Sequence, residues 1–141
     1  MHPHLFLPGL LIVAACGRGS PATAAYSHTK VVSVDRDFSL AVGEAARVAN
    51  TPITIGFAKV EDDSRCDPNV TCVWAGNGRV GLEVTGEGQK EALVLNTTLN
   101  PQSRSVHGFM LRLMDLNRRR PSATADSVGY KVTLRVSREA P

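Results

Sequence analysis

The sequence predicts an all-β domain, an antiparallel two-sheet β-sandwich of immunoglobulin-like size, with a small β-barrel as the alternative. Two observations lead to this fold class. Apolar residues alternate with polar ones in many short segments, and turn-forming residues separate those segments at short intervals. The chain has 141 residues, which is enough for one domain with its own hydrophobic core. We therefore expect a single folded domain.

Six segments are predicted as clear strands, five from this alternation and one, ALVLN, from a short apolar run at 92–95. They are FSLAV (38–42), ITIGF (53–57), VGLEV (80–84), ALVLN (92–96), FMLRL (109–113) and YKVTLRV (130–136). Two further strands are expected at KVVSV (30–34) and TCVWA (71–75), and turns at VGEAA, GNG, TGEGQ and LNPQS. Residues 109–120 would also suit a helix, but the alternation of Phe109, Leu111 and Leu113 favours a strand.

The N-terminus resembles the signal peptide of a bacterial lipoprotein. Residues 5–15 form an uncharged apolar run of 11 residues, too short to cross a bilayer as a helix. The run ends in VAAC (13–16), which resembles a lipobox, an aliphatic residue and two small ones before a cysteine. The resemblance implies that Cys16 is acylated, with palmitate expected, and becomes the mature N-terminus. An ordinary secretory signal ending at ATAA (22–25) is the alternative.

Three segments follow from this assignment. We expect a lipoprotein signal peptide at 1–15, a lipid-anchored flexible tether at 16–29 and a β-sandwich domain at 30–141. Gly17, not Asp, follows the cysteine, and by the resemblance this implies release to the outer membrane. We therefore expect the protein in the cell envelope, facing the periplasm or the cell surface and bound to the bilayer through its acylated N-terminus.

Two cysteines, Cys66 and Cys72, remain as a pair. Outside the cytosol such a pair is expected to be oxidised. The DPNVT segment between them contains turn-forming residues that bring the two Cα atoms within bonding distance. A disulfide that closes so short a loop contributes roughly 2 kcal/mol. Redox enzymes instead use a Cys-X-X-Cys pattern at a helix N-terminus, so we expect a structural bridge.

The region around these cysteines is similar to a family of small exported bacterial proteins to which no common activity is attached. The similarity consists of DSRC (63–66) followed by CVWAG (72–76), and it extends to the last predicted strand. In that family a proline follows the first cysteine directly, whereas here Asp67 comes before Pro68. The resemblance implies an exported β domain and carries no activity with it.

The acidic and amide residues near the cysteines are candidates for a metal site. They are Glu61, Asp62, Asp63, Asp67 and Asn69. Their oxygens would suit calcium, but their spacing does not match a calcium-binding loop. We expect instead a solvated turn in which Asp63 pairs with Arg65, and we expect no metal and no cofactor.

Catalytic motifs are missing from the sequence. After the signal peptide only His28 and His107 remain as histidine bases, and neither GxSxG nor HExxH occurs. We expect no catalytic residues and therefore no enzyme, with an unrecognised hydrolase as a remote alternative. The net charge of +3 and the aromatic content of 5% do not indicate a nucleic-acid-binding surface.

Two further features bear on binding. The segment NRRRPS (117–122) predicts either a solvated loop or a contact with phosphates. Trp74 is expected to pack over the disulfide or along the sheet edge, with exposed stacking on a ligand as the alternative. The sequence thus predicts a membrane-anchored envelope lipoprotein that acts as a non-enzymatic binding or structural module. The alternative is an inhibitor or chaperone-like factor that presents its loops to an exported protein partner.

Overall fold

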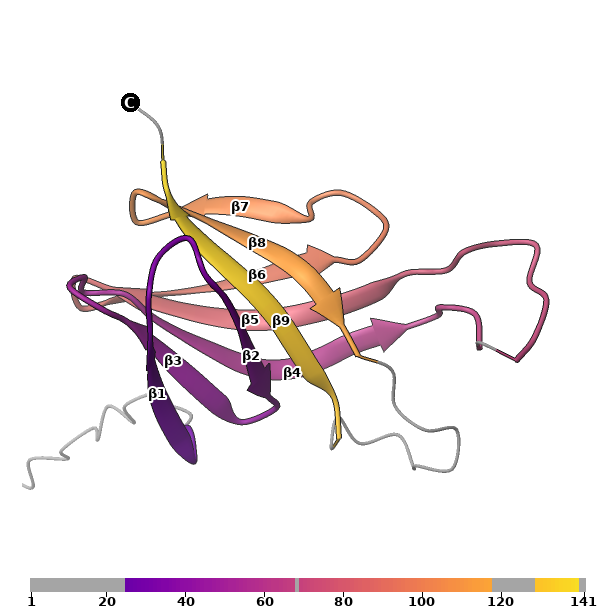
Figure 1. Ribbon diagram of the computed structural model, residues 1–141, viewed down its shortest axis with the longest axis horizontal. Coiled ribbons are helices and arrows are strands. Elements are labelled where there is room, and N and C mark those ends of the chain that lie inside the picture. Colours follow the sequence, from indigo (N-terminus) through magenta and orange to yellow (C-terminus); the bar gives the residue numbers. More distant parts are fainter. Residues whose placement is uncertain (1–24, 68, 118–128, 140–141) are drawn as a thin grey trace, which may run out of the picture.

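The computed structural model describes residues 25–67, 69–117 and 129–139. Within these ranges nine strands and no helix occur (Figure 1). They are β1 (His28–Val32), β2 (Asp37–Ala41), β3 (Glu44–Val48), β4 (Thr54–Asp63), β5 (Gly78–Gly86), β6 (Gln89–Asn96), β7 (Ser103–Val106), β8 (Phe109–Leu116) and β9 (Lys131–Arg138). The predicted all-β fold is therefore confirmed.

Two open sheets pack against each other, which confirms the sandwich over the closed alternative. One sheet has the strand order β1-β3-β4-β5-β6 and the other the order β2-β9-β8-β7. All neighbouring strands are antiparallel except β1 and β3, which run parallel. This exception arises because the chain crosses from β1 to β2 in the other sheet before it returns as β3.

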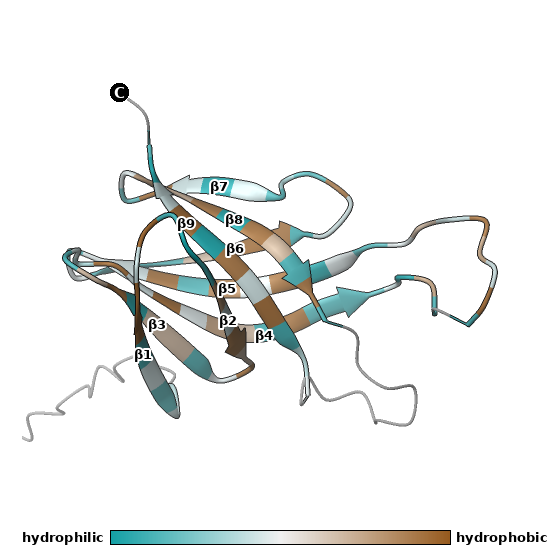
Figure 2. Cartoon of the chain, in the orientation of Figure 1, coloured by the Kyte–Doolittle hydropathy of each residue, from teal (hydrophilic) through white to brown (hydrophobic). Residues whose placement is uncertain are grey.

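The core lies between the sheets and is filled by the apolar residues of each alternating segment. Leu40, Phe57, Leu82, Leu111 and Leu134 are among the buried side chains, and they come from five strands. Figure 2 shows the alternation as brown and teal bands along single strands. The sequence period of two therefore identified the inward-facing residues correctly.

The strand at 109–113 is confirmed over its helical alternative and continues to Leu116 as β8. Its register shifts between Leu113 and Asp115. The irregularity places two consecutive exposed residues before Leu116, which is buried again. A β-bulge of this kind explains why the apolar spacing near the end of the segment also resembled that of a helix.

Three local features differ from the prediction. The turn expected in VGEAA forms at Val42 and Gly43, but strand β3, which begins at Glu44, was not predicted, because Ala45 and Ala46 are small enough to be buried without giving a strong apolar pattern. Strand β7 was not predicted because its residues are mostly polar. The strand expected at 71–75 does not form, and Val73 and Trp74 there are 91% and 82% exposed.

The described chain begins within the segment expected to be the tether. The Tyr26 ring lies across Gly56 of β4, where an added Cβ would be only 2.0 Å from the ring atom Cζ. Its hydroxyl donates a hydrogen bond to the Glu83 carboxylate at 2.5 Å, and Lys90 pairs with the same carboxylate at 2.8 Å. The folded part therefore includes Tyr26 and starts before residue 30.

Residues 1–15 and the expected lipid attachment site, Cys16, lie outside the described residues. In the part of the chain that the structure describes, no helix is long and apolar enough to cross a membrane.

The contact between Tyr26 and Gly56 predicts a coupled pair of substitutions. Gly56→Ala should lower the free energy of unfolding by about 1–3 kcal/mol, because the new methyl group displaces the Tyr26 ring. In a Tyr26→Ala background the same change should cost at most about 0.5 kcal/mol, since the methyl then enters open space. Urea unfolding of the two single variants and the double variant measures this; strictly additive effects would contradict the contact.

Candidate functional site

Residues 64–77, which we term the disulfide loop, connect β4 to β5 and project from one end of the sandwich (Figure 1). Cys66 and Cys72 are joined by a disulfide, with their Cα atoms 6.0 Å apart. The predicted bridge is thus confirmed. Between the cysteines the chain turns back, and Val70 N donates to Asp67 O at 3.1 Å. The bridge therefore constrains the segment from Cys66 to Cys72, and Val73 and Trp74 follow directly after it.

An ion pair between Asp63 and Arg65 closes the base of the loop; the pairing was predicted, but the solvated turn expected around it is wrong, because both side chains are largely buried. Arg65 Nε and Nη2 each lie 2.7 Å from one carboxylate oxygen of Asp63. The two side chains are only 15% and 11% exposed. Arg65 Nη1 also donates to Leu116 O at 2.5 Å, and the Tyr130 hydroxyl donates to Asp63 at 3.0 Å. The pair therefore joins β4 of one sheet to β8 and the start of β9 in the other.

Both members of this pair are held in their charged forms. Partial burial alone would raise the pKa of Asp63, but the hydrogen bonds and charge of Arg65, with the Tyr130 hydroxyl, outweigh it and lower that pKa. The hydrogen bonds from Arg65 to Asp63 raise the pKa of the guanidinium in turn. The pair thus stays charged at neutral pH, and its hydrogen bonds are made to groups of the protein itself.

Asn77 secures the other side of the base. Ser64 N donates to Asn77 O at 2.9 Å, and Asn77 N donates to Ser64 Oγ at 3.1 Å. The Asn77 side chain is buried, donates to Asn96 Oδ1 at 2.9 Å and accepts from Leu99 N at 3.3 Å. Gly76 has a φ of 66°, and an added Cβ would be 2.0 Å from Ser64 O, so a side chain does not fit there.

Apolar side chains project from the outer half of the loop. Val70, Val73 and Trp74 are 60%, 91% and 82% exposed. The expectation that Trp74 packs over the disulfide or along the sheet edge is therefore wrong, because the strand that would have carried it does not form. An exposed tryptophan two residues after a disulfide has the chemistry of a binding hot spot.

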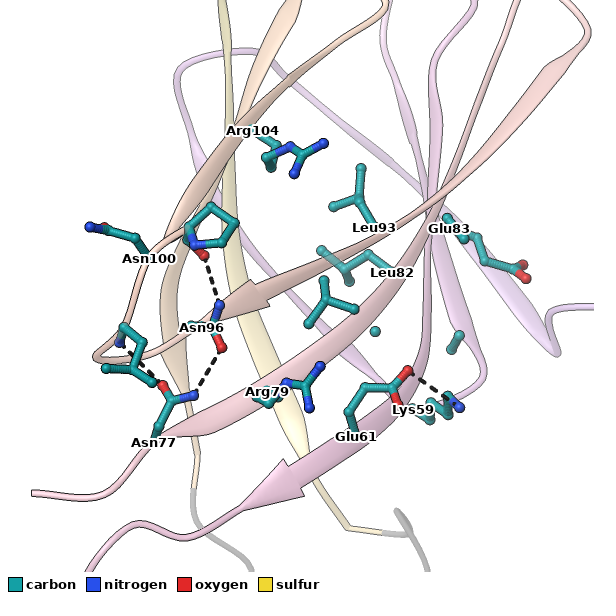
Figure 3. Close-up of a pocket in the computed structure, with 16 residues that line it drawn as sticks. Lys59, Glu61, Asn77, Arg79, Leu82, Glu83, Leu93, Asn96, Asn100 and Arg104 are labelled. Atoms are coloured by element: carbon teal, nitrogen blue, oxygen red, sulfur yellow. Dashed lines mark hydrogen bonds and ion pairs between the residues drawn. The ribbon is translucent and has the colours of Figure 1, made fainter.

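A groove of about 880 Å³ lies next to the loop, over β4, β5 and β6 (Figure 3). Lys59, Glu61, Arg79, Val94, Leu99 and Arg104 are among the residues that line it. Glu61 pairs with Lys59 at 3.3 Å, whereas Arg79 and Arg104 form no ion pair with any described residue. The groove therefore carries two arginines that are available to an anionic group.

The acidic residues considered as calcium ligands do not come together. Asp63 is bound by Arg65, Glu61 by Lys59, and Asp67 Oδ1 accepts a hydrogen bond from Asn69 N at 3.1 Å. Among the described residues, no three His, Cys, Asp or Glu side chains are arranged to hold a metal ion. The acids act instead in local pairs and turns.

The two histidines lie on different elements. His28 is exposed at the start of β1, whereas His107 lies in the turn between β7 and β8 with a φ of 48°. His107 Nε2 is buried and has no hydrogen-bond partner among the described residues, and its ring contacts the backbone near Gly86. Of NRRRPS only Asn117 is described; its side chain accepts a hydrogen bond from Lys131 N.

The groove was not predicted. Alternation along β5 places Arg79 on the outward side of its sheet, but nothing in the pattern indicates which outward side chains stay uncovered. Arg104 comes from β7, the strand that the pattern missed. A site assembled from three strands of one sheet and the edge of the other has no short sequence signature.

Comparison with protein-family models, with curated proteins and with solved structures finds no match for this chain. The loop and the groove are therefore the basis for any functional conclusion.

The ion pair predicts that loss of the Asp63 charge destabilises the fold. Asp63→Asn should lower the free energy of unfolding by about 2–4 kcal/mol at neutral pH, because it leaves the Arg65 guanidinium without its buried partner. The matched control is the exposed neighbour Asp62. Asp62→Asn should change the free energy of unfolding by less than about 0.5 kcal/mol.

The pH dependence follows from the lowered pKa of Asp63 in the folded protein. The contribution of the ion pair is complete above about pH 5 and is lost as the pH falls below about 4, through the lowered pKa. The difference between the wild type and Asp63→Asn should therefore shrink in acid. Urea unfolding at a series of pH values tests this, and a difference that stays constant down to about pH 2 would contradict it.

Proposed function

We propose that the protein is a lipid-anchored, non-enzymatic module of the bacterial cell envelope that binds another exported protein through its disulfide loop. One observation carries this proposal. Val73 and Trp74 are 91% and 82% exposed on a loop that a disulfide and a nearly buried ion pair hold in place. Large apolar side chains exposed in this way are typical of surfaces that become buried on binding.

The energetic argument has two parts. Burial of a large apolar side chain in a complex is worth roughly 1.5–3 kcal/mol. Ordering a mobile loop at the same time would consume part of that gain, whereas a preformed loop loses little conformational freedom on binding. The ties at Asp63, Arg65 and Asn77 therefore favour association through the loop.

The position of the loop supports a protein partner over the bilayer. The loop projects from one end of the long axis, and β1, near which the described chain begins, lies toward the other end (Figure 1). The proposed lipid on Cys16 would be at most roughly 35 Å from Tyr26, even with the intervening chain fully extended. The proposed anchor thus joins the domain at the end opposite the loop and leaves the loop accessible to a protein partner.

The same rigid loop supports a second candidate function, an inhibitor or chaperone-like factor for an exported partner. A loop with exposed Val73 and Trp74 has the form needed to enter an apolar cleft of such a protein. The two candidates differ in their consequence. An inhibitor lowers the turnover of its partner enzyme when the complex forms, and a structural module does not.

The anchor is tested by metabolic labelling with an alkyne analogue of palmitate. The wild-type protein should carry the label, and Cys16→Ser should lose it, because that thiol is the proposed acylation site. The matched control is the double variant Cys66→Ser, Cys72→Ser, which should remain labelled. Absence of label from the wild type would contradict the lipid anchor.

The binding surface is tested by photo-crosslinking in intact cells. A photoreactive residue at position 73 should capture a defined exported protein, and the same residue at position 31, another exposed valine on β1, should not. With the purified partner, Trp74→Ala should weaken binding by about 30-fold, as expected for a hot-spot residue. Equal capture from both positions, or unchanged affinity of Trp74→Ala, would refute the loop as the contact.

A further inference from the structure

Strand β6 is the longest of the four outer strands of the two sheets. The outer strands of the two sheets are β1, β6, β2 and β7, and they contain 5, 8, 5 and 4 residues. Natural sheets usually shorten, charge or cover such edges, because their unpaired backbone groups can pair with another chain. A long edge that lines a groove therefore needs an explanation.

The hydrogen-bond pattern shows which backbone groups of β6 are free. Thr97 N donates to Gly78 O at 3.0 Å. In an antiparallel pair every second residue directs its N–H and C=O groups to the partner strand, so from Thr97 backward Leu95 and Leu93 bond to β5. The N–H and C=O groups of Ala92 and Val94 therefore point away from β5. Asn96 N, which points the same way, donates to Pro101 O at 2.9 Å. For Ala92 and Val94 the described residues supply no such partner.

The groove over the face of the sheet reaches this edge. Ala92 and Val94 line it together with Arg104 of β7 and Arg79 of β5, which lie on either side of the β6 ribbon in Figure 3. Asp62 stands opposite Arg79 in the ladder, yet neither arginine has an ion pair in the described part of the chain. A free edge is thus flanked by two guanidinium groups.

We propose that the edge of β6 around Ala92 and Val94 binds an extended peptide segment with acidic side chains, which adds a strand to the five-stranded sheet. The backbone groups of β6 would supply affinity through main-chain hydrogen bonds, as in other cases of strand addition. Arg79 and Arg104 would select carboxylates, which fit the planar guanidinium group. This site is separate from the disulfide loop, and its occupation does not require Trp74.

Charge argues against a second copy of the chain as the occupant. Two β6 edges related by a two-fold axis between Ala92 and Val94 would set Asn96, and Arg79 beside it in the ladder, opposite Lys90 of the other copy. The acids of the groove, Glu61 and Glu83, are already paired with lysines. Such a dimer would therefore place like charges face to face, whereas an acidic segment neutralises them.

The probe is a short synthetic peptide in which pairs of glutamates alternate with pairs of valines, so that an added strand presents carboxylates on both of its faces, toward Arg79 and toward Arg104. Titrated into the isotope-labelled protein, it should shift the amide NMR signals of Ala92 and Val94 most and slow their hydrogen exchange. A peptide with lysine in place of glutamate should bind at least about tenfold more weakly, and so should a glutamate peptide interrupted by proline, which cannot donate the central bond. Equal binding of the lysine peptide, or signal changes away from β6, would overturn the proposal.

Two variants separate the backbone from the charges. Val94→Pro removes an outward N–H that β5 does not use. It should therefore preserve the sheet and weaken binding of the glutamate peptide about tenfold. The surface double variant Arg79→Ala, Arg104→Ala should retain the fold and lose the preference for glutamate over lysine. Trp74→Ala should bind the peptide like the wild type. Unchanged preference in the arginine variant, or a dimer in sedimentation that Val94→Pro dissociates, would refute the acidic-peptide site.

Discussion

The ion pair of Asp63 with Arg65 joins the two sheets at the end of the sandwich from which the disulfide loop leaves. Arg65 also reaches the Leu116 carbonyl, and Tyr130 reaches Asp63, so a charge in one sheet is satisfied by groups in the other. Removing two charges from water costs several kcal/mol, which only good geometry and additional hydrogen bonds offset. The structure supplies both. These directional contacts fix how the two sheets lie against each other at the base of the loop, which apolar packing alone does not specify.

The second tie, through Asn77, connects the loop base to the wall of the groove. Asn77 binds Ser64 on one side and, through its buried side chain, Asn96 and the backbone at Leu99 on the other. Leu99 and Asn96 line the groove. The base of the loop and the wall of the groove therefore belong to one hydrogen-bonded unit. The parts of the two surfaces that lie next to Asn77 thus need little reorganisation on binding.

Alternation of apolar residues was sufficient to predict the sandwich, because inward side chains such as Phe57 and Leu134 follow the period of two wherever a strand crosses the core. The disulfide and the contact of Asp63 with Arg65 could also be predicted, since the two partners of each contact are only a few residues apart in the sequence. Trp74 could not be placed, because strand propensity at TCVWA competes with the turn that the disulfide imposes. Strand β7 and the groove were missed for a related reason: polar edge residues such as Arg104 acquire their role only from neighbours distant in the sequence.

A free edge also has to be reconciled with a protein that stays folded and separate from its own copies. The Lys90 contact with Glu83 places charge at the start of β6, and the flanking arginines repel the same edge of another molecule. Further along, at Ala92 and Val94, the edge carries neither charge nor proline. The arrangement thus discourages pairing between identical chains and leaves the central backbone groups accessible. A lysine or a proline at Ala92 or Val94 would protect the edge from pairing with any other chain. The apolar side chains at these two positions instead leave the backbone groups of β6 accessible to a different chain.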